Sequence, residues 1–349
     1  MQMANVQSSW CLHKGAAGTL SRHRSVALFR PQDARRWTLH CRAPVVASAA
    51  VTESSEKLYQ SLESAALELK RSPPSLKQEA SGDILQAMNA LKEGGVTKKW
   101  GAALQEPFTR RNVFMGELKR VGVLNPQAIG IASIRDDKAF LFTVVGVTSV
   151  LAVAGQFLPG DWGFFVPYLT GGISIAVLAV GSTAPGLLQF FINKFSSIYP
   201  DYRERVVRHE AAHLLAGYLF GVPVTAYSLD LGKAHTDFAE AKLQRRLIEG
   251  QLEDSEIDAL AVVALAGASA EAMQYEEIVG QTADLVDLQR ILQRSKKKLN
   301  NSQQQNITRM AVYEACSLLR KYDKEYKALQ EAMRKGASIA ECVRTIEQA

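Results

Sequence analysis

The chain has 349 residues, of which 47% are hydrophobic and 22% charged, and its formal net charge is +6. This length exceeds the usual single domain of roughly 100 to 200 residues, so we expect two or three separately organised parts. Many basic residues fall within the first 42 positions, which argues against a nucleic-acid-binding surface. The four cysteines include no CxxC pair, which argues against a cysteine zinc site or a disulfide framework.

Residues 1–50 have the composition of an organelle transit peptide. Asp33 is their only acidic residue, whereas arginine, serine and alanine are frequent, and acidic residues return from Glu53 onward. No apolar stretch is long enough for a secretory signal. A clear arginine-lined amphipathic helix is missing, which favours a chloroplast over a mitochondrial destination. A disordered basic tail would have a similar composition.

Residues 51–135 are predicted to form a soluble helical arm. Leu58, Leu62 and Leu69 recur with helical spacing, and Pro73-Pro74 separates this helix from a second one around residues 84–91. No catalytic spacing occurs here, and no Walker A sequence occurs anywhere in the chain. We expect this arm to serve packing or contact with a partner.

Residues 139–192 are predicted to form two transmembrane helices. Two uncharged stretches, 139–158 and 163–192, are each long enough to cross a bilayer, and a short turn separates them. Pro185 is expected to end or kink the second helix. The alternative is a buried hairpin of a soluble protein. A transporter would need more spans with polar residues inside them.

The charges that flank this hairpin predict its orientation. Arg135 and Lys138 precede it, the turn carries only Asp161, and the basic residues that follow it are Lys194, Arg203 and Arg205. Basic residues favour the side on which the protein is made, so both ends of the hairpin are expected on that side. In a chloroplast that side is the stroma.

Residues 200–220 are predicted to form a helix that contains His209-Glu210-Ala211-Ala212-His213. Histidines at positions i and i+4 project from one helix face, so both imidazoles can bind one Zn²⁺ ion. Glu210 could then act as a general base on a water molecule bound to that ion. The alternative is that these are ordinary helix residues, one packed and one solvated.

A catalytic zinc site takes three protein ligands, so a third must come from elsewhere. Residues 258–274 are predicted to form a helix whose small side chains at 266–270 let it pack closely on the His209 helix, and a new helix is predicted to start at Asp284. The candidates for the third ligand are His235 and a group of downstream acidic residues, namely Glu271, Glu276, Glu277, Asp284 and Asp287. Asp284 could instead be only a helix N-cap.

The chain resembles the peptidase domain of FtsH-type membrane-bound zinc proteases over roughly residues 200–335. The matching segments are His-Glu-Ala-Ala-His at 209–213, Leu-Ala-Gly-Ala-Ser-Ala-Glu at 265–271 and Gly-Gln-Thr-Ala-Asp-Leu at 280–285. The resemblance implies that His209, His213 and Asp284 are the zinc ligands and that Glu210 is the catalytic base. It also implies that Glu271 does not bind the metal itself but orients one of its ligands. Asp287 and then His235 are the alternatives to Asp284.

The chain departs from this family at Ala212, where the family has glycine, at Ala283, where it has asparagine, and in having no ATPase module. It resembles the plastid FtsH-like group that keeps the peptidase domain alone. The expected fold is mainly α, with a transmembrane hairpin followed by an all-helical FtsH-like zinc peptidase domain at 200–349; one short strand or hairpin is expected within residues 222–231.

The expected function is that of a zinc metalloendopeptidase in the thylakoid or inner envelope membrane, with the peptidase domain facing the stroma. Its substrates would be unfolded or membrane-associated proteins, because the chain has no module that could unfold a stable one. A separate ATPase or FtsH-type subunit is the expected partner, and nucleic acid is not. The alternative is an inactive FtsH-like scaffold or assembly factor beside ring ATPase proteases.

Overall fold

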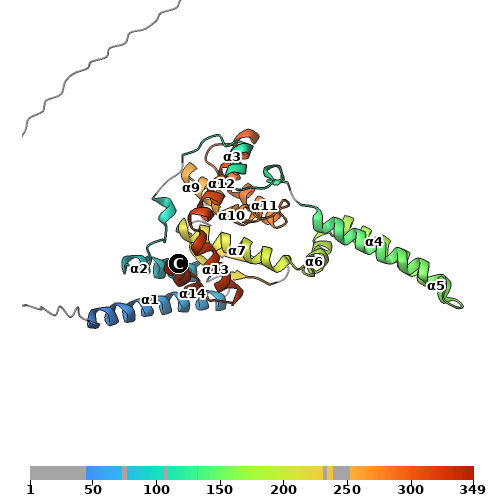
Figure 1. The fold of residues 1–349 in the computed structure, drawn as a ribbon, viewed down its shortest axis with the longest axis horizontal. Helices are drawn as coiled ribbons and strands as arrows, with labels where there is room; N and C mark the ends of the chain where they lie inside the picture. Colours follow the sequence, from blue (N-terminus) through green and yellow to red (C-terminus); the bar gives the residue numbers. More distant parts are fainter. Residues whose placement is uncertain (1–44, 73–76, 106–108, 132, 231–233, 239–251) are drawn as a thin grey trace, which may run out of the picture. The chain divides into compact units, whose positions relative to one another are not determined.

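The computed structural model describes residues 45–72, 77–105, 109–131, 133–230, 234–238 and 252–349. Most of the predicted transit peptide, with Cys11 and Cys41, lies outside these residues, as does the Pro73-Pro74 break. The described residues are mainly helical (Figure 1), which confirms the predicted class.

The N-terminal arm consists of helices α1 (Val45–Arg71), α2 (Lys77–Glu93) and α3 (Met115–Arg120), with short 3₁₀ turns at Ala102–Leu104 and Pro126–Ala128. The predicted apolar face of α1 is correct, because Leu62 and Leu69 are buried while Leu58 packs partly buried against the same core. Helical spacing thus predicted which face of the arm is covered, though not which part of the chain covers it.

The arm and the C-terminal region share one hydrophobic core. Trp100 lies against Tyr218 with ring centroids 5.3 Å apart, and the Gly101 amide donates to the Tyr218 carbonyl over 3.2 Å. The Tyr218 hydroxyl in turn donates to Glu347 Oε1 over 2.6 Å, and the amides of residues 98 and 99 donate to the same carboxylate. Residues 200–349 therefore do not bury their apolar surface by themselves.

Helices α4 (Arg135–Gly155) and α5 (Trp162–Thr183) pack side by side and are both long and apolar enough to cross a membrane (Figure 1). Few of their side chains are buried: Phe142 is 76% and Phe164 77% exposed. A core helix of a soluble protein would bury such side chains.

The second uncharged stretch is divided between two helices. This break was expected at Pro185. Helix α5 ends at Thr183, Ala184 has φ −139° and ψ 66°, and α6 (Pro185–Ser196) begins at the proline. Proline disfavours a helical conformation in the residue before it but is well accepted at the start of a helix. The predicted span 163–192 is corrected accordingly.

Helix α7 (Tyr202–Leu219) carries the histidine motif, and a β-hairpin follows it. Strands β1 (Val224–Ser228) and β2 (His235–Phe238) pair antiparallel, so the expectation of an all-helical domain is wrong in this detail, although a strand was predicted within 222–231. Gly217 has no side chain at the point where Phe238 lies on α7, and a Cβ there would overlap with the Phe238 ring. This close contact fixes β2 against α7.

The remaining helices are α9 (Asp254–Ala264), α10 (Ala266–Ala272), α11 (Gln281–Gln293), α12 (Asn301–Lys321), α13 (Asp323–Arg334) and α14 (Ile339–Gln348). The segment predicted as one helix over 258–274 is broken at Leu265, whose φ of −100° and ψ of 6° leave the helical range. As predicted, the small residues of α10 pack against α7. Helix α11 starts at Gln281, three residues before the predicted position.

Candidate metal centre

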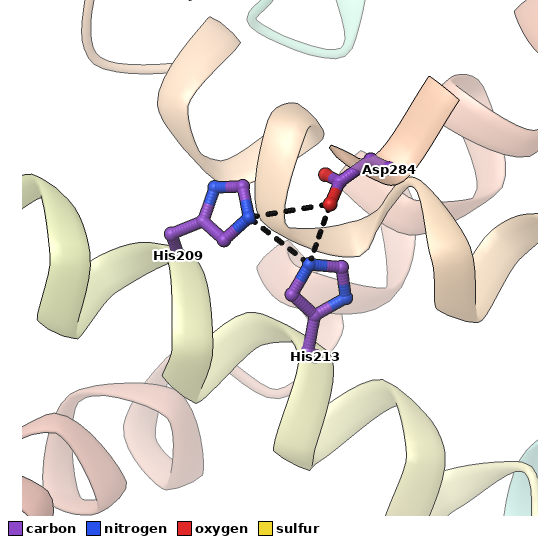
Figure 2. A group of neighbouring side chains, drawn as sticks. All are labelled: His209, His213 and Asp284. Carbon is purple, nitrogen blue, oxygen red and sulfur yellow. Dashed lines mark hydrogen bonds and ion pairs between the residues drawn. The ribbon is translucent and has the colours of Figure 1, made fainter. Parts of the chain in front are cut away.

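His209 and His213 project from α7 toward the same point (Figure 2). Both residues are only 8% exposed, and their Nε2 atoms lie 3.1 Å apart. The one-turn spacing that the sequence indicates is sufficient for this arrangement, because side chains at i and i+4 lie above one another on a helix.

Asp284 completes a triangle of donor atoms with the two imidazoles. Its Oδ1 lies 3.4 Å from His209 Nε2 and 3.2 Å from His213 Nε2 (Figure 2). A tetrahedral ion bound at about 2.0–2.1 Å keeps its ligand atoms roughly 3.3 Å apart. The three observed distances fit one face of such a tetrahedron, so the described residues form a buried group that can hold a metal ion.

The outer nitrogens of both imidazoles are occupied by acceptors. His213 Nδ1 lies 2.9 Å from the carbonyl oxygen of Val263, and His209 Nδ1 lies 2.8 Å from Glu271 Oε1. A carbonyl oxygen can only accept, so His213 must carry its proton on Nδ1, and a carboxylate favours the same tautomer in His209. In the neutral imidazoles both Nε2 lone pairs then point toward Asp284, which suits metal binding.

The electrostatics of the site favour a bound cation. Burial lowers the pKa of His209, but the carboxylates of Asp284 and Glu271 raise it more, so the pKa lies well above its ordinary value. Burial raises the pKa of Asp284, but His209 and His213 outweigh it and leave this pKa well below the usual range. The negative charge that stabilises a proton on these imidazoles would also attract a metal ion.

Two glycines make room for this group. A Cβ on Gly267 of α10 would overlap with Nε2 of both His209 and His213, and one on Gly280 would lie 2.5 Å from Glu271 Oε1. Neither glycine has a positive φ that would require it. Both are therefore needed for space at the site and not for backbone conformation.

Replacing Gly267 by alanine is expected to abolish metal binding, because the new methyl group occupies the space in which the two Nε2 atoms converge. Overpacking should also lower the free energy of unfolding by about 1–3 kcal/mol. Gly116→Ala is the matched control, since Gly116 lies in a helix and an added Cβ there would meet no other atom within 4 Å. Metal content and thermal unfolding of both variants test this; normal metal content in Gly267→Ala would contradict it.

Glu210 lies beside the metal group and is held by β2. It is buried, and its Oε2 accepts a hydrogen bond of 2.7 Å from the Thr236 hydroxyl. Sequence reasoning missed Thr236. Thr236 lies outside the strand expected within residues 222–231, and no sequence signal indicates it, because the contact depends on the packing of β2 against α7.

The structure brings together the residues that the family resemblance selected. Asp284 lies in the first turn of α11, which is capped at Gly280, and its Oδ2 accepts from the Ala268 amide over 3.1 Å; it is therefore not an N-cap. The side chain of Asp287 is 60% exposed and pairs with Arg290. His235 is exposed on β2 beside Asp237. Among the described residues, neither alternative belongs to the metal group.

Comparison of the chain with protein-family models, with curated proteins and with solved structures found no match.

Proposed function

We propose that this protein is a membrane-anchored, zinc-dependent metalloendopeptidase of the FtsH-like type. The observation that carries this proposal is the buried triangle of two imidazole nitrogens and one carboxylate oxygen beside Glu210. Two histidines and one acidic residue are a donor set that suits zinc and leaves a fourth position for chemistry, whereas magnesium and calcium prefer all-oxygen sites.

In this proposal each residue has a separate task. His209, His213 and Asp284 would hold the zinc ion, which when bound would act as a Lewis acid on the scissile carbonyl. Glu210 accepts the proton of the attacking water and passes it to the leaving amine nitrogen. Its Oε2 is engaged by Thr236, which leaves Oε1 for that proton transfer. Glu271 keeps the His209 ring in the orientation and tautomer that zinc binding requires.

The biological setting is part of the same proposal. Helices α4 and α5 anchor the protein in the thylakoid or inner envelope membrane, and residues 1–50 direct it to the chloroplast, with the peptidase region facing the stroma. The substrates are unfolded or membrane-associated proteins. A separate ATPase or an FtsH-type subunit would deliver folded ones.

The test is zinc content and cleavage of unfolded casein by the full chain, purified in detergent. The full chain is needed because the arm supplies part of the core around α7. We expect stoichiometric zinc and cleavage that a zinc chelator stops. Protein without bound zinc and without cleavage would instead favour the inactive scaffold.

Thr236→Val is expected to lower kcat for cleavage by roughly ten- to a hundredfold, because a hydrogen bond to a charged group contributes about 1.5–3 kcal/mol. Valine has a similar shape but cannot donate to Glu210. Thr236→Ser keeps the hydroxyl and should retain most of the activity. If valine and serine variants have equal kcat, Thr236 only fills space.

A further inference from the structure

Arg205 lies one turn before His209 on α7 and is held on several sides. Its Nε donates to Asp201 Oδ2 over 2.7 Å, its Nη1 donates to the carbonyl oxygen of Glu277 over 3.0 Å, and its guanidinium carbon lies 3.5 Å from the centre of the Tyr275 ring. The residue is only 9% exposed. A buried arginine is costly to desolvate, so these contacts indicate a specific role.

The guanidinium also lies beside Glu271, the residue that orients His209. Arg205 Nη1 is 3.6 Å from Glu271 Oε2, a distance of an ion pair but not of a hydrogen bond. Glu271 accepts hydrogen bonds from the amides of Val279 and Gly280 over 3.0 and 3.1 Å. These amides belong to the turn whose Glu277 carbonyl Arg205 binds, so Arg205 contacts both Glu271 and the turn that holds it.

The same turn leads directly into α11, which carries Asp284. Arg205 is therefore connected to two of the three metal ligands: to His209 through Glu271, and to Asp284 through the backbone of residues 277–281. Neither connection includes a contact of Arg205 with a ligand atom.

The positive charge of Arg205 also offsets the negative charges buried around the site. The carboxylates of Glu210, Glu271 and Asp284 are all buried. When all are ionised and both imidazoles are neutral, one divalent ion leaves one negative charge, which the guanidinium of Arg205, shared with the more exposed Asp201, offsets in part. Without Arg205 the loaded site would hold an uncompensated negative charge out of water, which is unfavourable.

We infer that Arg205 is a positioning residue of the metal centre, which fixes Glu271 and the turn at 277–280 so that His209 and Asp284 are preorganised for zinc. This inference rests on the proposed function. It assigns to Arg205 an effect on metal affinity, which can be measured without any assay of cleavage.

Zinc affinity of the full chain in detergent, measured by competition with a chromophoric chelator, tests this inference. Arg205→Gln is expected to weaken zinc binding by about 10- to 100-fold, the effect typical of partners that orient metal ligands. Glu271→Gln should have a similar effect. Because Arg205 acts through Glu271, the double variant should lose less than the product of the two single losses.

Arg110→Gln is the matched control. Arg110 binds the buried carboxylate of Asp258 through Nε over 2.7 Å, and neither residue belongs to the metal group. This variant should lose thermal stability but keep its zinc affinity within about twofold, since it removes no partner of a ligand. Arg205→Lys is the second variant if glutamine prevents folding; it keeps the charge but not the forked contacts, and a smaller loss is expected.

The outcomes separate the two proposals. A wild-type chain that binds no zinc would overturn both. If the wild-type chain binds zinc and Arg205→Gln binds it with unchanged affinity, only the role of Arg205 is overturned. The same holds for unchanged affinity in Arg205→Lys, where Arg205→Gln does not fold. Equal losses in Arg205→Gln and Arg110→Gln, or losses that multiply fully in the double variant, would also overturn it.

Discussion

Replacing Glu210 by glutamine is expected to lower kcat/KM for casein cleavage by about 10²- to 10⁴-fold, the usual contribution of a general base. Glutamine has nearly the same shape and can still interact with the Thr236 hydroxyl, but it cannot take a proton from water. Zinc content should stay unchanged, because Glu210 is not among the three residues whose donor atoms converge. Metal analysis and steady-state kinetics on the same preparation measure both quantities.

This experiment also distinguishes the peptidase from a scaffold. A scaffold needs no general base, so any weak cleavage in its preparations would come from contaminants and would persist in Glu210→Gln. Cleavage that is equal in the wild-type chain and in the variant would therefore remove the enzymatic proposal, even when zinc is bound.

Replacing Asp284 by alanine is expected to remove zinc almost completely. Its Oδ1 is one corner of the donor triangle, and Oδ2 accepts from the Ala268 amide, so the change removes a ligand together with its support. The loss should exceed the roughly 10- to 100-fold that loss of an outer partner causes. Chelator competition measures it directly.

Asp287→Ala is the control for this prediction because it removes a carboxylate from the same helix. Asp287 pairs with Arg290 at the surface, so zinc affinity and cleavage should stay near the wild-type values. If Asp287→Ala lost zinc and Asp284→Ala kept it, the assignment of the third ligand would be wrong.

The sequence predicted those parts of the site that depend on local spacing. His209, Glu210 and His213 share a helix, so their relation follows from helix geometry alone. Asp284 and Glu271 are far from them along the chain, and spacing left several acidic candidates open; the family resemblance selected these two. Glu271 is brought to His209 by the packing of α10 on α7. Asp284 lies on α11, is bound to the Ala268 amide of α10 and reaches both histidines from there.

Other features could not be predicted because they depend on how distant elements pack. The apolar face of α1 shows that something covers Leu62, but not that the C-terminal region does. Thr236 reaches Glu210 where β2 packs on α7, with Phe238 against Gly217. In the sequence, Arg205 is one of several basic residues after the hairpin that predict its orientation in the membrane. Only its contacts in the folded chain indicate a role at the metal centre.

The core shared by residues before α4 and after α6 places a condition on how the chain can be threaded through a bilayer. Trp100 and Tyr218 belong to the same folded core, although the two apolar helices lie between them in the sequence. A core cannot be divided between two aqueous compartments, so the intervening chain must return to the side from which it left. If the chain crosses a membrane between these residues, the number of crossings must therefore be even. This holds whichever side the flanking charges select.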